Sequence, residues 1–404
     1  MLAPWQSERK RRFQMRTLEK PEAYARALLV AAFALGCGED SAPPTQANPS
    51  DPVPGAEETQ SSDVPLHARA FLNLPERAAD AALAPQWLSA TGAFTNLATL
   101  ETSAGILPYG VQTPLWSDGA HKRRWLSLPE GGQIDFSATG PWTFPPGTVF
   151  VKQFALALDE NRPEQLRQLE TRFWVAGSDG EFYGLVYKWD DDQQDAQLLL
   201  EGASEELSIA GQDGSQRAQT YTYPAVTGCK ACHSPSAGLV RGVRTLQLNG
   251  SFDYGAARGT DAAPANQLAA LEALGMFSTP IGDPAQYGHL SALDDESAPL
   301  EERVRSYWDS NCSMCHNDSA NSRSWDARYT TALADQKVLL TLPLSGPGDN
   351  DLRLIVPQEP DRSYLFLRVD SDKPGVRMPP VLRNRIDDSY VEVLRSWILA
   401  LEKQ

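Results

Sequence analysis

The sequence predicts an α+β, multidomain protein in which an antiparallel β sandwich or barrel-like domain is followed by an all-α domain. Residues 106–225 alternate β-branched and aromatic segments with short polar turns, as antiparallel strands do. Residues 300–404 instead carry apolar side chains at helical spacing. A chain of 404 residues is long enough for two or three domains.

Residues 1–36 have the pattern of a secretory signal peptide. Basic residues precede the apolar run LLVAAFALG, which is about half the ~20 residues that a membrane-spanning helix needs. Because the signal is long when counted from Met1, Met15 is an alternative start. We expect an exported protein on the periplasmic side of the cell envelope. The basic residues of this segment are Arg9, Lys10, Arg11, Arg12, Arg16, Lys20 and Arg26.

Cys37 directly follows this signal in the sequence ALGC, which resembles the lipobox of bacterial lipoproteins. Ala34 stands where the lipobox prefers leucine. The resemblance implies that Cys37 is lipidated and anchors the protein to a membrane, whereas cleavage of an ordinary signal peptide nearby is the alternative. Residues 37–65 are rich in proline and acidic side chains, so we expect a disordered tether.

A β-rich domain is predicted at residues 106–299, after a short helical lead-in at residues 66–105. The run VFVKQFALAL is typical of a strand, and LETRFWVAGSDGEFYGLVYKW predicts two strands joined by a hairpin turn at GSDG. AQLLL, ELSIA and QTYTYP predict further strands. PANQLAALEALGMF at residues 264–277 has the apolar spacing of an amphipathic helix.

One short motif occurs twice, as CKACH at residues 229–233 and as CSMCH at residues 312–316. Two disulfides would give no role to His233 and His316. A zinc site can be built from two Cys-x-x-Cys pairs, but such pairs typically lie ~15–20 residues apart, much closer than here. A thioredoxin-like dithiol needs no histidine after its second cysteine.

Covalently attached haem accounts for every residue of both motifs. Two thiols on one turn add to the two vinyl groups of a porphyrin, and the adjacent histidine lies under the iron as its proximal ligand. We therefore expect two haem c groups, each holding one iron. The predicted haem-binding residues are Cys229, Cys232, His233, Cys312, Cys315 and His316.

Three helices are expected in residues 300–404. One delivers Cys312 to its haem, a short one follows Pro360, and the last begins after Asp387 or Asp388 as its N-cap. Between the second and third helices lies Met378, which two prolines follow. This order of elements resembles class I cytochrome c. The resemblance implies an all-α cytochrome c-like domain in which His316 and Met378 are the two axial ligands of haem 2.

A longer stretch, residues 85–404, resembles a family of bacterial envelope diheme c-type cytochromes. The segments that carry this resemblance are LPYGVQTPLWSDGAHKRRWLSLP, FPPGTVFVKQF, LETRFWV and NQLAALEALGMF. It implies a haem-binding protein that transfers electrons to redox partner proteins of the envelope, and it implies no substrate. The net charge of −16 makes a nucleic-acid partner a poor match, because a phosphate backbone would be repelled.

Two function classes remain open, and the sixth ligand of haem 1 distinguishes them. A non-catalytic electron-transfer protein would close this position, with His121, His289 or Met276 as candidate ligands. A diheme oxidoreductase, peroxidase-like or oxidising a small molecule, would leave it open for catalysis.

The basic run at residues 122–124 also has two interpretations. It meets haem propionates or an anionic partner, or it is a solvated strand end, and we favour the latter.

Overall fold

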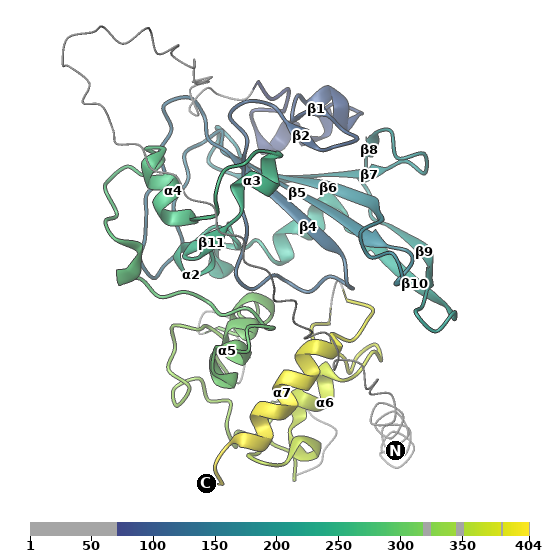
Figure 1. The fold of residues 1–404 in the computed structure, drawn as a ribbon, viewed down its shortest axis with the longest axis vertical. Coiled ribbons are helices and arrows are strands. Elements are labelled where there is room, and N and C mark those ends of the chain that lie inside the picture. The colour runs from purple at the N-terminus through teal and green to yellow at the C-terminus, as the bar shows by residue number, and fades with distance from the viewer. Residues whose placement is uncertain (1–70, 318–324, 345–350, 381–382, 404) are drawn as a thin grey trace, which may run out of the picture. The chain divides into compact units, whose positions relative to one another are not determined.

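A six-stranded antiparallel sheet with strand order β3-β4-β5-β6-β7-β8 dominates the fold (Figure 1). The computed structural model describes residues 71–317, 325–344, 351–380 and 383–403. The strands of this sheet are β3 (Leu107–Pro108), β4 (His121–Ser127), β5 (Val149–Ala157), β6 (Leu166–Ala176), β7 (Phe182–Trp189) and β8 (Ala196–Leu198).

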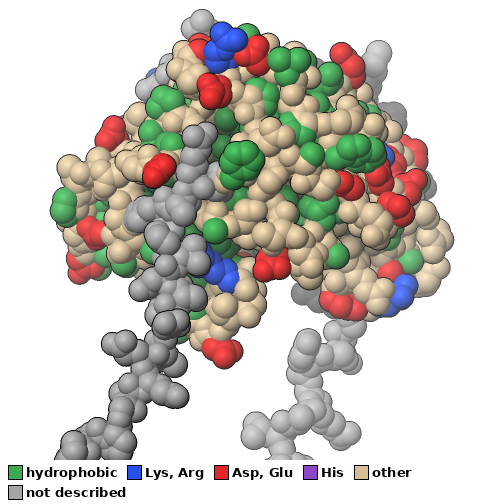
Figure 2. All heavy atoms as spheres, turned by 90° about the horizontal axis from the view of Figure 1, so that it is seen from above, with side chains coloured by type: hydrophobic (Ala, Val, Ile, Leu, Met, Phe, Trp, Pro, Cys, Tyr) green, Lys and Arg blue, Asp and Glu red, His purple; other side chains and the backbone are tan. Residues whose placement is uncertain are grey.

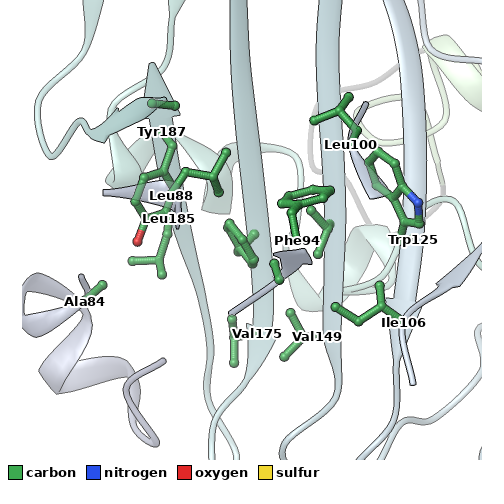
Figure 3. Packing of buried hydrophobic residues seen from close by; sticks show 14 of the residues in the cluster. Ala84, Leu88, Phe94, Leu100, Ile106, Trp125, Val149, Val175, Leu185 and Tyr187 are labelled. Carbon is green, nitrogen blue, oxygen red and sulfur yellow. The ribbon is translucent and has the colours of Figure 1, made fainter. Parts of the chain in front are cut away.

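One face of the sheet is covered by the segments that precede it. These are the 3₁₀ turns η1 (Ala78–Leu83) and η2 (Leu88–Thr91) and the hairpin of β1 (Phe94–Asn96) and β2 (Glu101–Thr102). Figure 3 shows Leu88 beside Leu185 of β7, and the ring of Phe94 packs against Trp125 of β4 with centroids 5.5 Å apart. Because side chains alternate along a strand, this apolar layer contains Trp125, Val151 and Phe173, whereas their neighbours in sequence face the other way.

The opposite face of the sheet carries two further apolar clusters. Leu126, Phe150 and Trp174 pack against the segments that follow the sheet. Farther along the same strands, Phe154 and Leu169 pack against a separate ribbon made of β9 (Ala203–Ala210) and β10 (Gln216–Tyr223). A cavity lined by residues of both clusters is the first candidate site.

Short elements follow the ribbon in chain order. They are η3 (Val226–Ala231), η4 (Pro235–Ala237), α2 (Thr245–Leu248), β11 (Ser251–Phe252), α3 (Tyr254–Arg258), β12 (Ala265–Asn266), α4 (Gln267–Ala273) and η5 (Pro284–Gln286). The predicted helix at 264–277 is therefore present but shorter, because Asn266 accepts the N–H groups of Leu268 and Ala269 and starts the helix there.

The C-terminal region contains α5 (Leu300–Asn311), η6 (Pro360–Arg362), α6 (Tyr364–Val369) and α7 (Asp388–Ala400). α5 and α7 pack through Tyr307 and Tyr390, whose rings stack with centroids 3.7 Å apart. The indole of Trp308 donates to the Tyr390 hydroxyl at 2.7 Å. Asp387 caps α7 by accepting the N–H of Tyr390, so the predicted capping residue is confirmed.

The predicted hairpin at GSDG is also confirmed, since Ala176 of β6 pairs with Phe182 of β7 across that turn. The segments predicted as strands from AQLLL, ELSIA and QTYTYP form β8, β9 and β10. Among the described residues, no helix has the length and apolarity needed to cross a membrane. The predictions for the signal peptide, Cys37 and the tether lie outside the described residues.

The predicted fold class is wrong. The β elements form one six-stranded sheet and separate two-stranded ribbons rather than a sandwich or barrel, and no all-α cytochrome c-like domain is evident. The three C-terminal α-helices have 12, 6 and 13 residues, and the segments between α5 and α6 form parallel bridges such as Leu339–Ile355. Helical periodicity identifies a helix, but it does not say which partner the helix packs against.

The helices instead belong to the same compact unit as the sheet, which spans residues 61–404. The side chain of Asn311, at the end of α5, accepts the N–H of Trp116 at 2.7 Å. The carboxylate of Asp118 accepts the N–H groups of Asn384 and Arg385 at 2.8 Å. Contacts from the loop before β4 therefore hold α5 and the segment before α7 beside the β region.

Candidate functional site

The first Cys-x-x-Cys-His motif forms a tight turn directly after β10. The N–H groups of Cys232 and His233 both donate to the carbonyl of Cys229, at 3.2 and 3.0 Å. Cys229 lies against β7 at Gly184, where an added Cβ would be 2.8 Å from the Cys229 sulfur. Gly184 is thus a position where the absence of a side chain lets the motif approach the sheet.

His233 is held by one backbone carbonyl. Its Nδ1 lies 2.8 Å from the carbonyl oxygen of Leu239, and the indole of Trp174 donates to the same oxygen at 3.1 Å. Because a carbonyl only accepts, Nδ1 carries the proton and Nε2 keeps its lone pair. The Trp174 ring, 4.6 Å away between centroids, fixes the imidazole from one side. Burial lowers the pKa of His233 to about 4, so the ring is neutral at pH 7.

Cys229, Cys232 and His233 line a cavity of about 200 Å³ between the sheet and the loop that follows the motif, here called cavity 1. Its wall combines the aromatic side chains Phe150 and Trp174 with an unusual number of cations. The cationic residues in the wall are Arg124, Lys152, Arg172, Arg241 and Arg244.

The second motif repeats the turn of the first at the end of α5. The N–H groups of Cys315 and His316 donate to the carbonyl of Cys312, at 3.0 and 2.9 Å. A tryptophan again accompanies the histidine, since the rings of Trp325 and His316 lie 4.9 Å apart between centroids. Burial, followed by the nearby Cys315, raises the pKa of Cys312 to about 12, so its thiol stays protonated at neutral pH.

Cys312, Cys315, His316 and Met378 line a second cavity of about 320 Å³, here called cavity 2. The structure thus brings Met378 to the same cavity as His316. The backbone of Met378 is fixed at both ends, because its N–H donates to the carbonyl of Arg368 at 3.0 Å and its carbonyl accepts from Arg383.

Arg383 holds the Met378 loop and was not identified from the sequence. The residue is 4% exposed, and its guanidinium also donates to the carbonyls of Val369, Ser371 and Arg385, at 2.6, 3.2 and 2.7 Å. The guanidinium group has five N–H donors in a planar fork, so it can bind several carbonyls at once. The lysine ammonium cannot reproduce this geometry.

Cavities 1 and 2 are neighbours. Cys232 of the first motif and Met314 of the second line both of them. The two sites are also tied through hydrogen bonds, because Arg241 in the wall of cavity 1 donates to the hydroxyl of Ser313 at 3.0 Å.

The ligand candidates for haem 1 do not line cavity 1. His121 is exposed at the start of β4, and His289 is exposed in the segment before α5. Met276 is 4% exposed and packs in the apolar cluster with Phe277. Along the described chain, the methionine that reaches the wall of cavity 1 is Met314.

The basic run at residues 122–124 divides between the two faces of β4. Arg123 is exposed and donates to the carbonyl of Thr99 at 3.1 Å, so the solvated-strand interpretation fits this residue. Arg124 faces the opposite way and lines cavity 1. Lys152 of β5 also lines this cavity. The sequence feature that could have identified Lys152 is a single lysine within the largely apolar segment VFVKQF.

No protein-family model, curated protein or solved structure matches this chain. Within the described part of the chain, no group of three or more His, Cys, Asp and Glu side chains has the arrangement of a metal site. The four motif cysteines are free thiols.

Replacing Arg383 with lysine should loosen the Met378 loop. Lysine can bind only some of these carbonyls and would leave the others without a donor. We therefore expect the free energy of unfolding to fall by roughly 2–4 kcal/mol. Hydrogen exchange at the Met378 amide should also become faster. Arg377→Lys is the matched control in the same loop, because the Arg377 guanidinium makes one long hydrogen bond of 3.5 Å, to the backbone carbonyl of Asp372. Equal effects of the two substitutions would contradict this role.

Proposed function

We propose that the chain is a diheme c-type cytochrome that transfers electrons in the bacterial cell envelope through two covalently attached haems. The observation that carries this proposal is the pairing of sites. Each Cys-x-x-Cys-His motif lines a cavity of its own, and the two cavities share Cys232 and Met314. Two redox groups in adjacent cavities are well placed to exchange electrons with each other.

The residues present fit haem attachment at both motifs. In each, the same backbone turn holds two free thiols and a histidine at one cavity wall. Each thiol would add across one vinyl group, so that a C–S bond forms at one carbon, the thiol hydrogen passes to the other, and no oxidant is needed. A bound haem supplies reversible one-electron exchange between ferric and ferrous iron.

The protein's own side chains would hold and tune these groups. His233 offers an Nε2 lone pair because Leu239 fixes its tautomer. His316 and Met378 share cavity 2, and a His/Met ligand pair raises the reduction potential. Aromatic side chains in the walls, such as Trp174 in cavity 1 and Trp325 in cavity 2, would shield part of each group from water, which also affects the potential.

The acidic surface favours a cationic redox partner. Net charge is −16, and Figure 2 shows acidic side chains scattered over one face with few basic ones. Opposite charge on a partner would steer the encounter and make its rate dependent on salt. Lipidation at Cys37 would keep the protein at a membrane on the periplasmic side, within reach of such partners.

One observation favours the alternative, a diheme oxidoreductase with an open position at haem 1. His121, His289 and Met276 do not line cavity 1, whereas several cations do. Carbon monoxide separates the two proposals, because rapid binding to reduced haem 1 requires an open sixth position. Slow or absent binding supports the non-catalytic protein, with the ligand coming from a residue in the wall of cavity 1.

Removal of either cysteine pair should halve the haem content. Cys229→Ala with Cys232→Ala should leave the haem in cavity 2, and Cys312→Ala with Cys315→Ala should leave the haem in cavity 1. Covalent haem is measured by the pyridine haemochrome assay and by intact-protein mass. Wild-type protein purified from the periplasm with zinc and no haem would contradict the proposed function.

Gly184→Ala should selectively reduce attachment at the first motif. The new methyl group would overlap the Cys229 sulfur, and overpacking of this kind costs about 1–3 kcal/mol. Gly228→Ala is the matched control, because its added Cβ would lie 3.7 Å from the nearest atom. Mass analysis of peptides containing each motif reports the two haems separately. Loss at the second motif instead would exclude this explanation.

Met378→Leu should lower the midpoint potential of haem 2, because it removes a soft thioether donor that favours ferrous iron. The near-infrared sulfur-to-iron charge-transfer band should disappear, and reduced haem 2 should then bind carbon monoxide. Met276→Leu is the control, since Met276 is buried away from both cavities. If the band persists in Met378→Leu, another residue is the ligand.

A further inference from the structure

Three cationic side chains form a row across the sheet at cavity 1. Arg124 on β4 lies opposite Lys152 on β5, and Lys152 lies opposite Arg172 on β6. All three line the cavity. Like charges directly opposite each other on neighbouring strands destabilise a sheet. A negative charge nearby would therefore stabilise this row of cations.

Arg172 has its counter-charge within the protein. It forms an ion pair with Glu170, a fully buried carboxylate that also accepts the Tyr221 hydroxyl at 2.7 Å. This pair stabilises one end of the row and leaves little acceptor capacity for the other two cations.

Arg124 and Lys152 have no carboxylate partner among the described residues. Arg124 makes one long hydrogen bond of 3.5 Å to the carbonyl of Lys122. The ammonium of Lys152 lies 4.9 Å from the centre of the Phe154 ring. Among the described residues, this ammonium forms no hydrogen bond and no ion pair. Both side chains are half-buried, and an unpaired cation is costly there, so burial lowers the pKa of Lys152 well below its usual value. A bound anion would stabilise the charged form of Lys152 and pair with Arg124.

Arg241 adds a third such cation from the loop opposite the sheet. Its guanidinium donates to the carbonyl of Ala237 at 2.8 Å and to the hydroxyl of Ser313, both of them neutral acceptors. Neighbouring Arg244 differs, because it is paired with Asp309. The acidic residue in the cavity wall is Asp118, whose carboxylate is engaged by backbone N–H groups after residue 383.

We propose that Arg124, Lys152 and Arg241 form a binding site in cavity 1 for a carboxylate-type oxyanion beside His233. Two guanidinium groups and one ammonium from opposite walls of the cavity suit a planar anion with several acceptor oxygens. Lys152 and Arg241 both lie close enough to act electrostatically on the His233 ring. The anion therefore sits where it would affect any iron bound at that histidine.

The carboxylate has two sources. One is the pair of propionate groups of haem 1 itself, and in that case the inference rests on the proposed function. The other is a free small carboxylate or similar oxyanion, which would be a substrate or effector of an open haem site. The chemistry at the three cations is the same in both cases.

The test compares Lys152→Met and Arg124→Gln with Arg123→Gln in the full chain. Arg123 is the matched control because it is the next residue in β4 and points away from cavity 1. Removing one like charge from the row should leave the sheet folded, which circular dichroism checks. Haem content, the midpoint potential of each haem and calorimetric binding of formate are then measured. Single-haem cysteine variants assign the potentials.

If haem propionates are the anion, Lys152→Met and Arg124→Gln lower the potential of haem 1, and formate does not bind to the wild type. If a free anion is bound, formate binds to the wild type and its Kd rises at least about tenfold in the two variants, since each loses a charge-assisted contact. Arg123→Gln changes neither quantity.

The inference is overturned if the protein carries both haems, the potentials do not change and formate does not bind. A chain without haem would instead refute the proposed function. Formate calorimetry on that chain would still decide the anion site, because absent binding would then overturn it as well.

Discussion

The antiparallel register of β4, β5 and β6 is the constraint on which the candidate site depends. Pairing of Leu126 with Phe150, and of Phe150 with Trp174, sets an apolar row next to the cationic row of Arg124, Lys152 and Arg172. Because side chains alternate, a shift of one residue would turn both rows away from cavity 1. The same register places Trp174 where its indole shares the Leu239 carbonyl with His233.

This register also explains how a cluster of cations is tolerated inside the fold. The opposite face of the same strands buries Trp125, Val151 and Phe173 under the N-terminal segments. That burial stabilises the strands and opposes the repulsion between like charges on the other face. Two of the three proposed anion-binding cations, Arg124 and Lys152, therefore lie on the sheet, and Arg241 joins them from the opposite loop.

Much of the local structure could be predicted from the sequence, because its signals are local. Strand alternation and the turn at GSDG indicated β6 and β7, and helical spacing indicated α5 and α7. The two Cys-x-x-Cys-His motifs indicated the side chains that line the two cavities. The fold class could not be predicted in this way, because the helices of residues 300–404 pack here beside a sheet through contacts such as Asn311 with Trp116.

Long-range contacts also determine the parts of the site that sequence patterns missed. Arg241 and Arg244 follow the first motif closely in sequence, yet both contact the end of α5, through Ser313 and Asp309. Gln247 adds a hydrogen bond of 2.7 Å to Ser310 in the same helix.

The loop after one motif is therefore bound to the helix that carries the other. A change in either cavity can be transmitted through these contacts, since Arg241 lines cavity 1 while Ser313 lies within the second motif. If both cavities hold redox groups, the charge state at one site would act on the other through the half-buried guanidinium of Arg241. Partial burial lowers the local dielectric, so such coupling would be stronger than between fully exposed sites.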